Sequence, residues 1–208
     1  GKSIPQIRHK AVITMAGDHG VVAEKIGNWP QEITAQMVYN FLQGGAGINV
    51  IARQAGARII VVDMGVATEL EPDTRLLSRK AAPGTRNMAL GPAMTEEQAV
   101  KAIESGIEVV AAEMAKGLDI VATGDMGIGN TTPSSAICTV MTGKPVAEVT
   151  GRGTGIDDEQ LAHKVDVVNR ALAVNHPDPG QPLDVLAKVG GFEIGGLVGV
   201  MLAAAARR

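Results

Sequence analysis

The sequence predicts an α/β fold built on a doubly wound, mostly parallel sheet that is flanked by helices. Two observations support this class. Short apolar runs typical of buried strands alternate, along the 208 residues, with segments that have the apolar spacing of helices. Polar residues and glycines directly follow the strand-like runs, which is where open α/β sheets place their binding sites. We therefore expect a single α/β domain over residues 1–208.

The first part of the chain contributes two of the expected strands. Residues 11–15 form the first strand. After a loop over residues 21–29, Pro30 suits the first turn of a helix, and a second helical piece covers residues 48–54. The second strand, residues 58–64, has a continuous apolar run at residues 59–62, so we expect it to be parallel and buried on both faces.

The second part of the chain carries most of the helices. A long connection without regular structure is expected over residues 67–92, and Thr95 then forms a capping box with Gln98 at the start of a helix. Residues 119–123 are expected to be a buried strand. Residues 146–150 are either a short strand or an extended lead-in. The remaining helices are expected at residues 132–141, from Asp157 onward, at residues 183–189 and at residues 192–206.

A glycine-rich turn joins the expected strand at residues 119–123 to the next helix. Its small and polar residues are Gly124, Gly127, Gly129, Asn130, Thr131 and Thr132. Because the first N–H groups of a helix lack internal partners, such a turn can bind a phosphate, and the helix dipole favours the negative charge. We expect the turn to hold the phosphate of a nucleotide-like substrate. A tight turn that uses glycine for geometry alone is the alternative, and Asn130 in the lysine position of a P-loop disfavours NTP hydrolysis.

The composition excludes several classes of function. A net charge of −3 gives no reason to expect nucleic acid or an anionic membrane surface as a partner. The single cysteine, Cys138, excludes an intramolecular disulfide and fits a reducing cytoplasm. Metal binding is not expected, because none of the four histidines lies at ligand spacing from another.

No targeting signal is expected from the sequence as given. The apolar tail over residues 195–206 is too short to cross a bilayer, and no signal peptide is visible. The sequence begins without methionine and stops inside an alanine-rich helical segment, so we expect it to be a piece of a longer protein, truncated at both ends.

Five runs carry a resemblance that no single motif would support. They are AGDHGVVAE (residues 16–24), PQEITAQMVYNFLQGGAGINVIARQ (residues 30–54), GDMGIGNTT (residues 124–132), GRGTGIDDEQLAHK (residues 151–164) and GGFEIGG (residues 190–196). Together, in this order and over nearly the whole chain, they resemble the nicotinate-nucleotide:dimethylbenzimidazole phosphoribosyltransferase family. The resemblance implies a Rossmann-like sheet with part of a smaller helical subdomain, in a protein that generally forms a homodimer.

The resemblance also implies a reaction of cobalamin biosynthesis. In that reaction, 5,6-dimethylbenzimidazole displaces nicotinate from C1 of nicotinate mononucleotide and gives α-ribazole 5′-phosphate. No metal or redox cofactor is needed, because the positively charged ring nitrogen already makes nicotinate a good leaving group. The protein has to hold the phosphate, align the base with the sugar carbon and remove the N–H proton of the base.

The resemblance assigns roles to particular residues. The phosphate and ribose cradle is expected at Asp125, Gly127, Ile128, Gly129, Asn130, Thr131, Gly151, Arg152, Gly153 and Lys164. The pocket for the incoming base is expected at Asp18, His19, Asn28, Gln36 and Met37. From the residues alone, the alternative for Asp18 and His19 is a turn aspartate and a surface histidine. For Lys164 it is a surface lysine whose stem borders an apolar face, which is the usual outcome for lysine.

The chain departs from the family pattern at the general base. In the family this base is expected to be a glutamate in a GEGTGA-like motif near the C-terminus, and the run GRGTG (residues 151–155) is only superficially similar. We expect the base beyond Arg208, and we interpret Glu193 as structural or as part of a dimer contact. Loss of a general base costs about 10²–10⁴ in rate, so residues 1–208 alone should bind phosphate weakly and catalyse poorly.

Two other functions remain open from the sequence. The first is a non-catalytic module that binds a nucleotide phosphate on the same sheet. The second is a related transferase that uses another aromatic acceptor.

Overall fold

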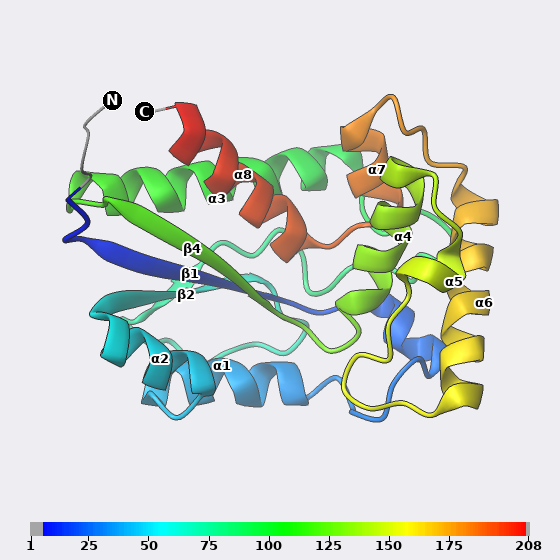
Figure 1. Ribbon diagram of the computed structural model, residues 1–208, viewed down its shortest axis with the longest axis horizontal. Coiled ribbons are helices and arrows are strands. Elements are labelled where there is room, and N and C mark those ends of the chain that lie inside the picture. Colours follow the sequence, from blue (N-terminus) through cyan, green and yellow to red (C-terminus); the bar gives the residue numbers. More distant parts are fainter. Residues whose placement is uncertain (1–5, 207–208) are drawn as a thin grey trace.

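The computed structural model describes residues 6–206 and contains one parallel sheet in the order β3-β2-β1-β4 (Figure 1). β1 (Lys10–Gly17) lies between β2 (Ala57–Gly65) and β4 (Ile120–Met126), and the short β3 (Leu76–Ser78) pairs with β2. The parallel α/β prediction is confirmed.

Helices cover both faces of this sheet, as in a doubly wound fold. α1 (Ile33–Gln43) and α2 (Gly47–Ala55) lie on one face, and α3 (Glu96–Ala115) and α8 (Phe192–Ala206) lie on the other (Figure 1). Each strand supplies both faces, because successive side chains of a strand point to opposite sides. Val62 packs in the core under α3 and α8, whereas its neighbour Val61 packs in the core under α1.

A smaller group of helices lies beyond the carboxyl ends of the strands. It consists of α4 (Thr131–Thr142), α5 (Val146–Val149), α6 (Asp158–Asn175) and α7 (Pro182–Val189), and the 3₁₀ helix η1 (Gly20–Glu24) leads into it from β1 (Figure 1). Within the described residues, every helix is too short or too polar to span a membrane.

Glycines allow α3 and α8 to pack backbone against backbone. A Cβ at Gly106 would lie 1.9 Å from the carbonyl oxygen of Gly196, and a Cβ at Gly199 would lie 1.9 Å from the carbonyl oxygen of Ile103. This close contact fixes α8 across the sheet, and its first turn brings Glu193 against the end of β1.

The prediction of burial for the strand at residues 119–123 is wrong. β4 is an edge strand that pairs with β1 alone in the described part of the chain, and Ile120 is 47% exposed. An apolar run does not distinguish a central strand of a sheet from an edge strand.

Three local predictions also need correction. The connection at residues 67–92 contains β3, whose Leu76 and Leu77 continue the sheet beside β2. The expected loop at residues 21–29 begins with η1. Residues 146–150 hold the single helical turn α5 instead of a strand. The sequence pattern could not distinguish the two, because a run this short shows no clear period. The capping box of Thr95 and Gln98 is present as predicted.

Candidate functional site

The sheet has a topological switch point between β1 and β4. From β1 the chain proceeds to β2 and β3 on one side, and it returns to the other side of β1 with β4. Two neighbouring parallel strands with connections in opposite directions leave a crevice at their carboxyl ends, where open α/β sheets bind ligands. Here those ends are Gly17 and Met126.

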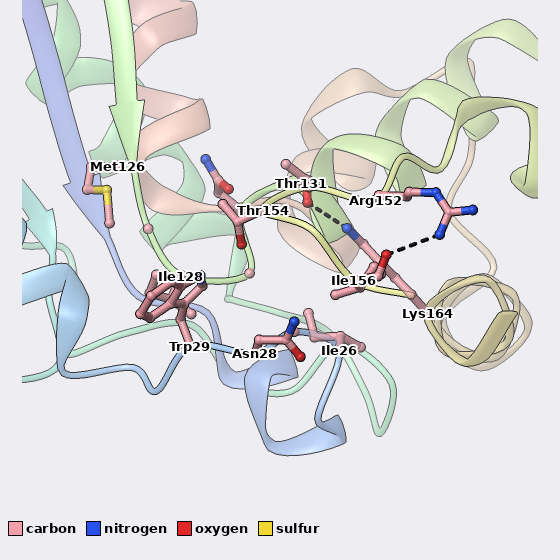
Figure 2. A pocket seen from close by; sticks show the side chains of 15 residues that line it. Ile26, Asn28, Trp29, Met126, Ile128, Thr131, Arg152, Thr154, Ile156 and Lys164 are labelled. Atoms are coloured by element: carbon pink, nitrogen blue, oxygen red, sulfur yellow. Dashed lines mark hydrogen bonds between the residues drawn. The ribbon is translucent and has the colours of Figure 1, made fainter. Parts of the chain in front are cut away.

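A cavity of about 230 Å³ opens beside this point. It is lined by residues 26–29, residues 126–131, residues 152–154, Ile156 and Lys164. Figure 2 shows how these three chain segments and the Lys164 side chain surround the cavity. The GDMGIGNTT and GRGTG turns, which are separate in the sequence, therefore face each other across one cavity.

The first glycine turn, GDMGIGNTT, presents backbone amides to the cavity. The amides of Ile128 and Asn130 donate to Thr34 Oγ1 and to the Gly127 carbonyl, at 3.0 Å each. Within residues 6–206, the amides of Gly129 and Thr131 have no assigned acceptor. Both residues line the cavity, so two N–H groups at the start of α4 are available to an anion.

Lys164 is the most informative side chain of the site. It is only 2% exposed, although lysine is almost never fully buried without a partner. Its Nζ donates to Thr131 Oγ1 at 2.6 Å and to the Gly151 carbonyl at 3.3 Å, and no carboxylate pairs with it in the described part of the chain. Burial lowers the pKa of Lys164, because desolvation penalises the charged ammonium.

The position of Lys164 corrects the surface-lysine alternative. The apolar spacing of the sequence predicts a buried face of α6 made of Leu161, Val165, Val168 and Leu172. The buried residues are Lys164, Val167, Val168, Ala171 and Asn175, so the helix is rotated from the expected orientation. The sequence period alone does not reveal this, because the lysine replaces an apolar residue in the buried stripe.

The second glycine turn, GRGTG, approaches Lys164 closely, but the side chain of Arg152 points away from that lysine. A Cβ at Gly153 would lie 3.8 Å from Lys164 Nζ, and the φ of Gly153 is 56°, a conformation that favours glycine. Arg152 donates to the Ile156 carbonyl at 3.1 Å and pairs with Asp158. Figure 2 shows its guanidinium turned to Ile156. Arg152 therefore lines the cavity but has its charge already compensated.

Two polar residues on the first turn bind each other. Asn130 Nδ2 donates to Asp125 Oδ2, and Asn130 lines the cavity whereas Asp125 does not. The pair fixes the end of β4 to the start of α4.

The residues expected in the base pocket do not all converge. Asn28 lines the cavity, and its Oδ1 accepts from Gln160 Nε2 at 2.6 Å. Met37 is half-buried in the core between α1 and the sheet, and Gln36 is exposed on the same helix. Neither residue lines the cavity.

Asp18 and His19 were expected in the base pocket, but both are buried behind the cavity and do not line it, and the burial of His19 also corrects the alternative of a surface histidine. Asp18 accepts from the Ala67 amide at 2.8 Å, and burial raises its pKa. His19 is 1% exposed and pairs with Glu193, with 3.2 Å between Nε2 and Oε1.

Sequence reasoning missed Trp29. This side chain is 52% exposed and lines the cavity beside Ile128 (Figure 2). The available signal was its rarity, because the chain has only one tryptophan and Trp29 directly precedes the resembling run that begins at Pro30. It gives the site an aromatic surface and a fluorescent reporter.

The cavity lacks a proton acceptor of the expected kind. Among the described residues that line it there is no aspartate or glutamate. No group of three or more His, Cys, Asp or Glu side chains in residues 6–206 is placed to hold a metal ion.

Comparison with known proteins gives a consistent result. Residues 1–208 match a family described as phosphoribosyltransferase. The chain is 61% identical, over 208 residues, to the nicotinate-nucleotide–dimethylbenzimidazole phosphoribosyltransferase of Desulforudis audaxviator, and 59% identical to the protein of the same name from Dehalococcoides mccartyi. These alignments cover 100% of this chain and 59% of each relative.

A solved structure shares the fold. The crystal structure of CobT from Thermus thermophilus superimposes with a TM-score of 0.93 at 46% identity, and the match covers 98% of this chain and 61% of that one. The chain therefore spans about three fifths of the length of the proteins that it matches.

Proposed function

Because this chain belongs to the nicotinate-nucleotide–dimethylbenzimidazole phosphoribosyltransferase family, we propose that it provides the phosphoribosyl-binding part of such an enzyme. The reaction displaces nicotinate from C1 of nicotinate mononucleotide. A ring nitrogen of 5,6-dimethylbenzimidazole forms the new bond to that carbon, nicotinate leaves with the electron pair of the old bond, and the N–H proton of the base passes to a general base. The product, α-ribazole 5′-phosphate, serves cobalamin synthesis.

The observation that carries this proposal is a buried lysine without a carboxylate partner. In residues 6–206, Lys164 contacts only neutral oxygens, those of Thr131 and Gly151. A phosphate beside it would supply the missing negative charge and would accept from the amides of Gly129 and Thr131. We therefore assign the phosphate to the space between the two glycine turns.

The remaining cradle and base-pocket residues have supporting roles in this proposal. Asp125 and Asn130 hold the first turn in place, and Gly153 allows the second turn to approach the ammonium group. Asn28 and Trp29 form the wall that would face a planar base, and Trp29 offers an aromatic surface for stacking. Gln36 and Met37 lie outside the cavity, so a contact with the base would need α1 to move.

We place the general base outside this chain. The cavity has no lining carboxylate among the described residues, and the relatives are longer than this chain. Residues 1–208 alone should therefore release nicotinate about 10²–10⁴-fold more slowly than a full-length relative. The test is an assay of nicotinate release from nicotinate mononucleotide and dimethylbenzimidazole by both proteins, and equal rates would contradict the assignment.

The missing carboxylate also favours a second candidate, a non-catalytic module that binds a nucleotide phosphate. This candidate predicts that nicotinate mononucleotide binds but that no added segment and no aromatic base, whether benzimidazole, phenol or adenine, leads to turnover. The same assay with these bases separates the candidates and identifies the acceptor.

We also propose that the protein is a cytoplasmic homodimer, which rests on the family resemblance and on the single cysteine. Sedimentation equilibrium of a full-length relative and of this chain tests the dimer.

A further inference from the structure

A buried ion pair lies directly beneath the first glycine turn. His19 follows β1, and Glu193 belongs to the first turn of α8. The two side chains are 1% and 0% exposed, with 3.2 Å between His19 Nε2 and Glu193 Oε1. Within the described residues, neither Glu193 carboxylate oxygen has a hydrogen-bond partner, so His19 provides its compensating charge.

Glycines from three separate motifs enclose this pair. A Cβ at Gly127 would lie 2.9 Å from His19 Nε2 and 2.1 Å from the Gly17 carbonyl oxygen. A Cβ at Gly17 would lie 3.0 Å from Glu193 Oε2. A Cβ at Gly191 would lie 2.5 Å from both Glu193 oxygens and 2.7 Å from His19 Cε1. The backbone at the end of β1, at the first glycine turn and before α8 therefore packs against the two charged groups without intervening side chains.

A buried ion pair contributes little net stability to a core. Desolvation of two ions commonly costs as much as their attraction returns, so apolar residues of similar volume would usually stabilise the fold at least as well. What the pair provides instead is a fixed geometry. The imidazolium of His19 fixes the position of the Glu193 carboxylate, and the backbone of Gly127 packs against the imidazole ring. Gly127 in turn accepts from the Asn130 amide at 3.0 Å, which sets the turn that carries the Gly129 and Thr131 amides.

We propose that His19 and Glu193 are positioning residues, which hold the anion-binding turn at residues 127–131 in its binding geometry while His19 is protonated. This inference rests on the proposed function, since it concerns the same anion site. The two residues do not line the cavity, so they act on the ligand through the turn alone.

The electrostatic surroundings favour the charged form of His19. Burial disfavours the imidazolium, but the charge and close contact of Glu193, with smaller contributions from Asp18 on the same loop and Asp125 at the end of β4, together raise the pKa of His19. The folded-state pKa thus lies above the unfolded value of about 6.5. The stabilisation is therefore complete below that value and is lost as the pH rises through the raised pKa.

The test compares Glu193→Gln with Glu113→Gln. Glu113 is also a buried carboxylate in an ion pair, with Arg58 at 3.0 Å, but it does not line the cavity and contacts neither glycine turn. The probe is inorganic sulfate, whose charge is constant from pH 5 to pH 9, and binding is read from Trp29 fluorescence. The protonation of His19 is followed by NMR of its imidazole ring.

We expect Glu193→Gln to weaken sulfate binding by about tenfold or more at pH 6 and to lower the pH at which His19 titrates. Glu113→Gln should leave sulfate affinity within about twofold of wild type. A folded Glu193→Gln protein that binds sulfate like wild type would overturn the proposal, and so would an equal loss in Glu113→Gln.

A second measurement separates failure of the inference from failure of the anion site. If wild type binds no sulfate, or if Glu193→Gln does not fold, amide hydrogen exchange of residues 127–131 is measured in wild type across the His19 titration. A protection factor, which is corrected for the intrinsic rise of exchange with pH, that falls as His19 loses its proton supports the positioning role, even without an anion site. Protection that stays constant through the titration overturns it.

Discussion

At the scale of single residues, Lys164 links the sequence to the chemistry. It occupies a position of α6 where an apolar side chain would pack well, and its ammonium group reaches the space between two glycine turns. Burial of the Lys164 ammonium group destabilises the fold, and a bound anion would offset this desolvation penalty. Function therefore explains this residue better than stability does.

Replacement of Lys164 separates the two contributions. Lys164→Met should weaken nicotinate mononucleotide binding by about 10- to 100-fold, because a charge-assisted hydrogen bond is worth about 1.5–3 kcal/mol. The free energy of unfolding should stay unchanged or rise, because a buried unpaired charge is removed. Trp29 fluorescence titration and chemical denaturation measure the two effects. Lys144→Met, at an exposed position after α4, is the control and should change neither.

The lowered pKa of Lys164 also predicts a pH dependence. Its unfolded-state pKa is about 10.4, so the unfolded chain retains the proton more strongly than the folded one. The free energy of unfolding should therefore rise with pH once the pH passes the lowered folded-state pKa. Sulfate affinity should fall over the same range as the ammonium is lost. In Lys164→Met both alkaline changes should disappear, and their persistence would show that another group is responsible.

At the scale of elements, the turn between β4 and α4 depends on the close approach of its backbone to the end of β1. Gly127 and Gly124 lie on the same segment but differ in their surroundings. A Cβ at Gly127 would meet the Gly17 carbonyl at 2.1 Å, whereas a Cβ at Gly124 would make an ordinary contact of 3.4 Å with Thr14 Oγ1.

This difference gives a matched pair of substitutions. Gly127→Ala should destabilise the fold by about 1–3 kcal/mol through overpacking and should displace the anion-binding amides. Gly124→Ala, in a strand, should be neutral or slightly stabilising, because alanine lowers the backbone entropy of the unfolded chain. Thermal denaturation together with sulfate titration checks both. Equal effects of the two substitutions would show that the turn does not depend on this contact.

Much of this architecture could be predicted from local signals. The capping box of Thr95 with Gln98 marks the start of α3, and Asp157 marks the start of α6, and both helices begin there. The strand–turn–helix at residues 119–132 is predictable because glycine and capping residues follow an apolar run directly.

Other features depend on tertiary context that no local pattern encodes. The rotation of α6 that buries Lys164 is set by packing against α4, and the exposure of β4 is set by its place in the sheet. The burial of His19 follows from its pairing with Glu193, a residue 174 positions away in the sequence. The role of Trp29 as a wall of the cavity depends on how three segments converge.

At the scale of the whole molecule, apolar surface lies outside the site. A groove of about 460 Å³ between α3, α4, α7 and α8 is lined almost entirely by apolar side chains, including Met141 and Leu202. The outer edge of β4, with Ile120, is exposed as well. Exposed apolar patches and open strand edges favour association.

We therefore expect residues 1–208 to self-associate as concentration rises. Ile120→Lys should reduce this association, because a charge on an edge strand opposes strand pairing. Size-exclusion chromatography with light scattering over a range of concentrations measures it. A chain that stays monomeric at high concentration would mean that these surfaces are not adhesive, and it would also count against the proposed homodimer.

The most direct test of the phosphate site is a crystal structure of this chain with nicotinate mononucleotide. We expect the phosphate between the two glycine turns, within hydrogen-bond distance of Lys164 Nζ and of the amides of Gly129 and Thr131. A phosphate bound elsewhere, with Lys164 still bonded only to Thr131 and Gly151, would contradict it.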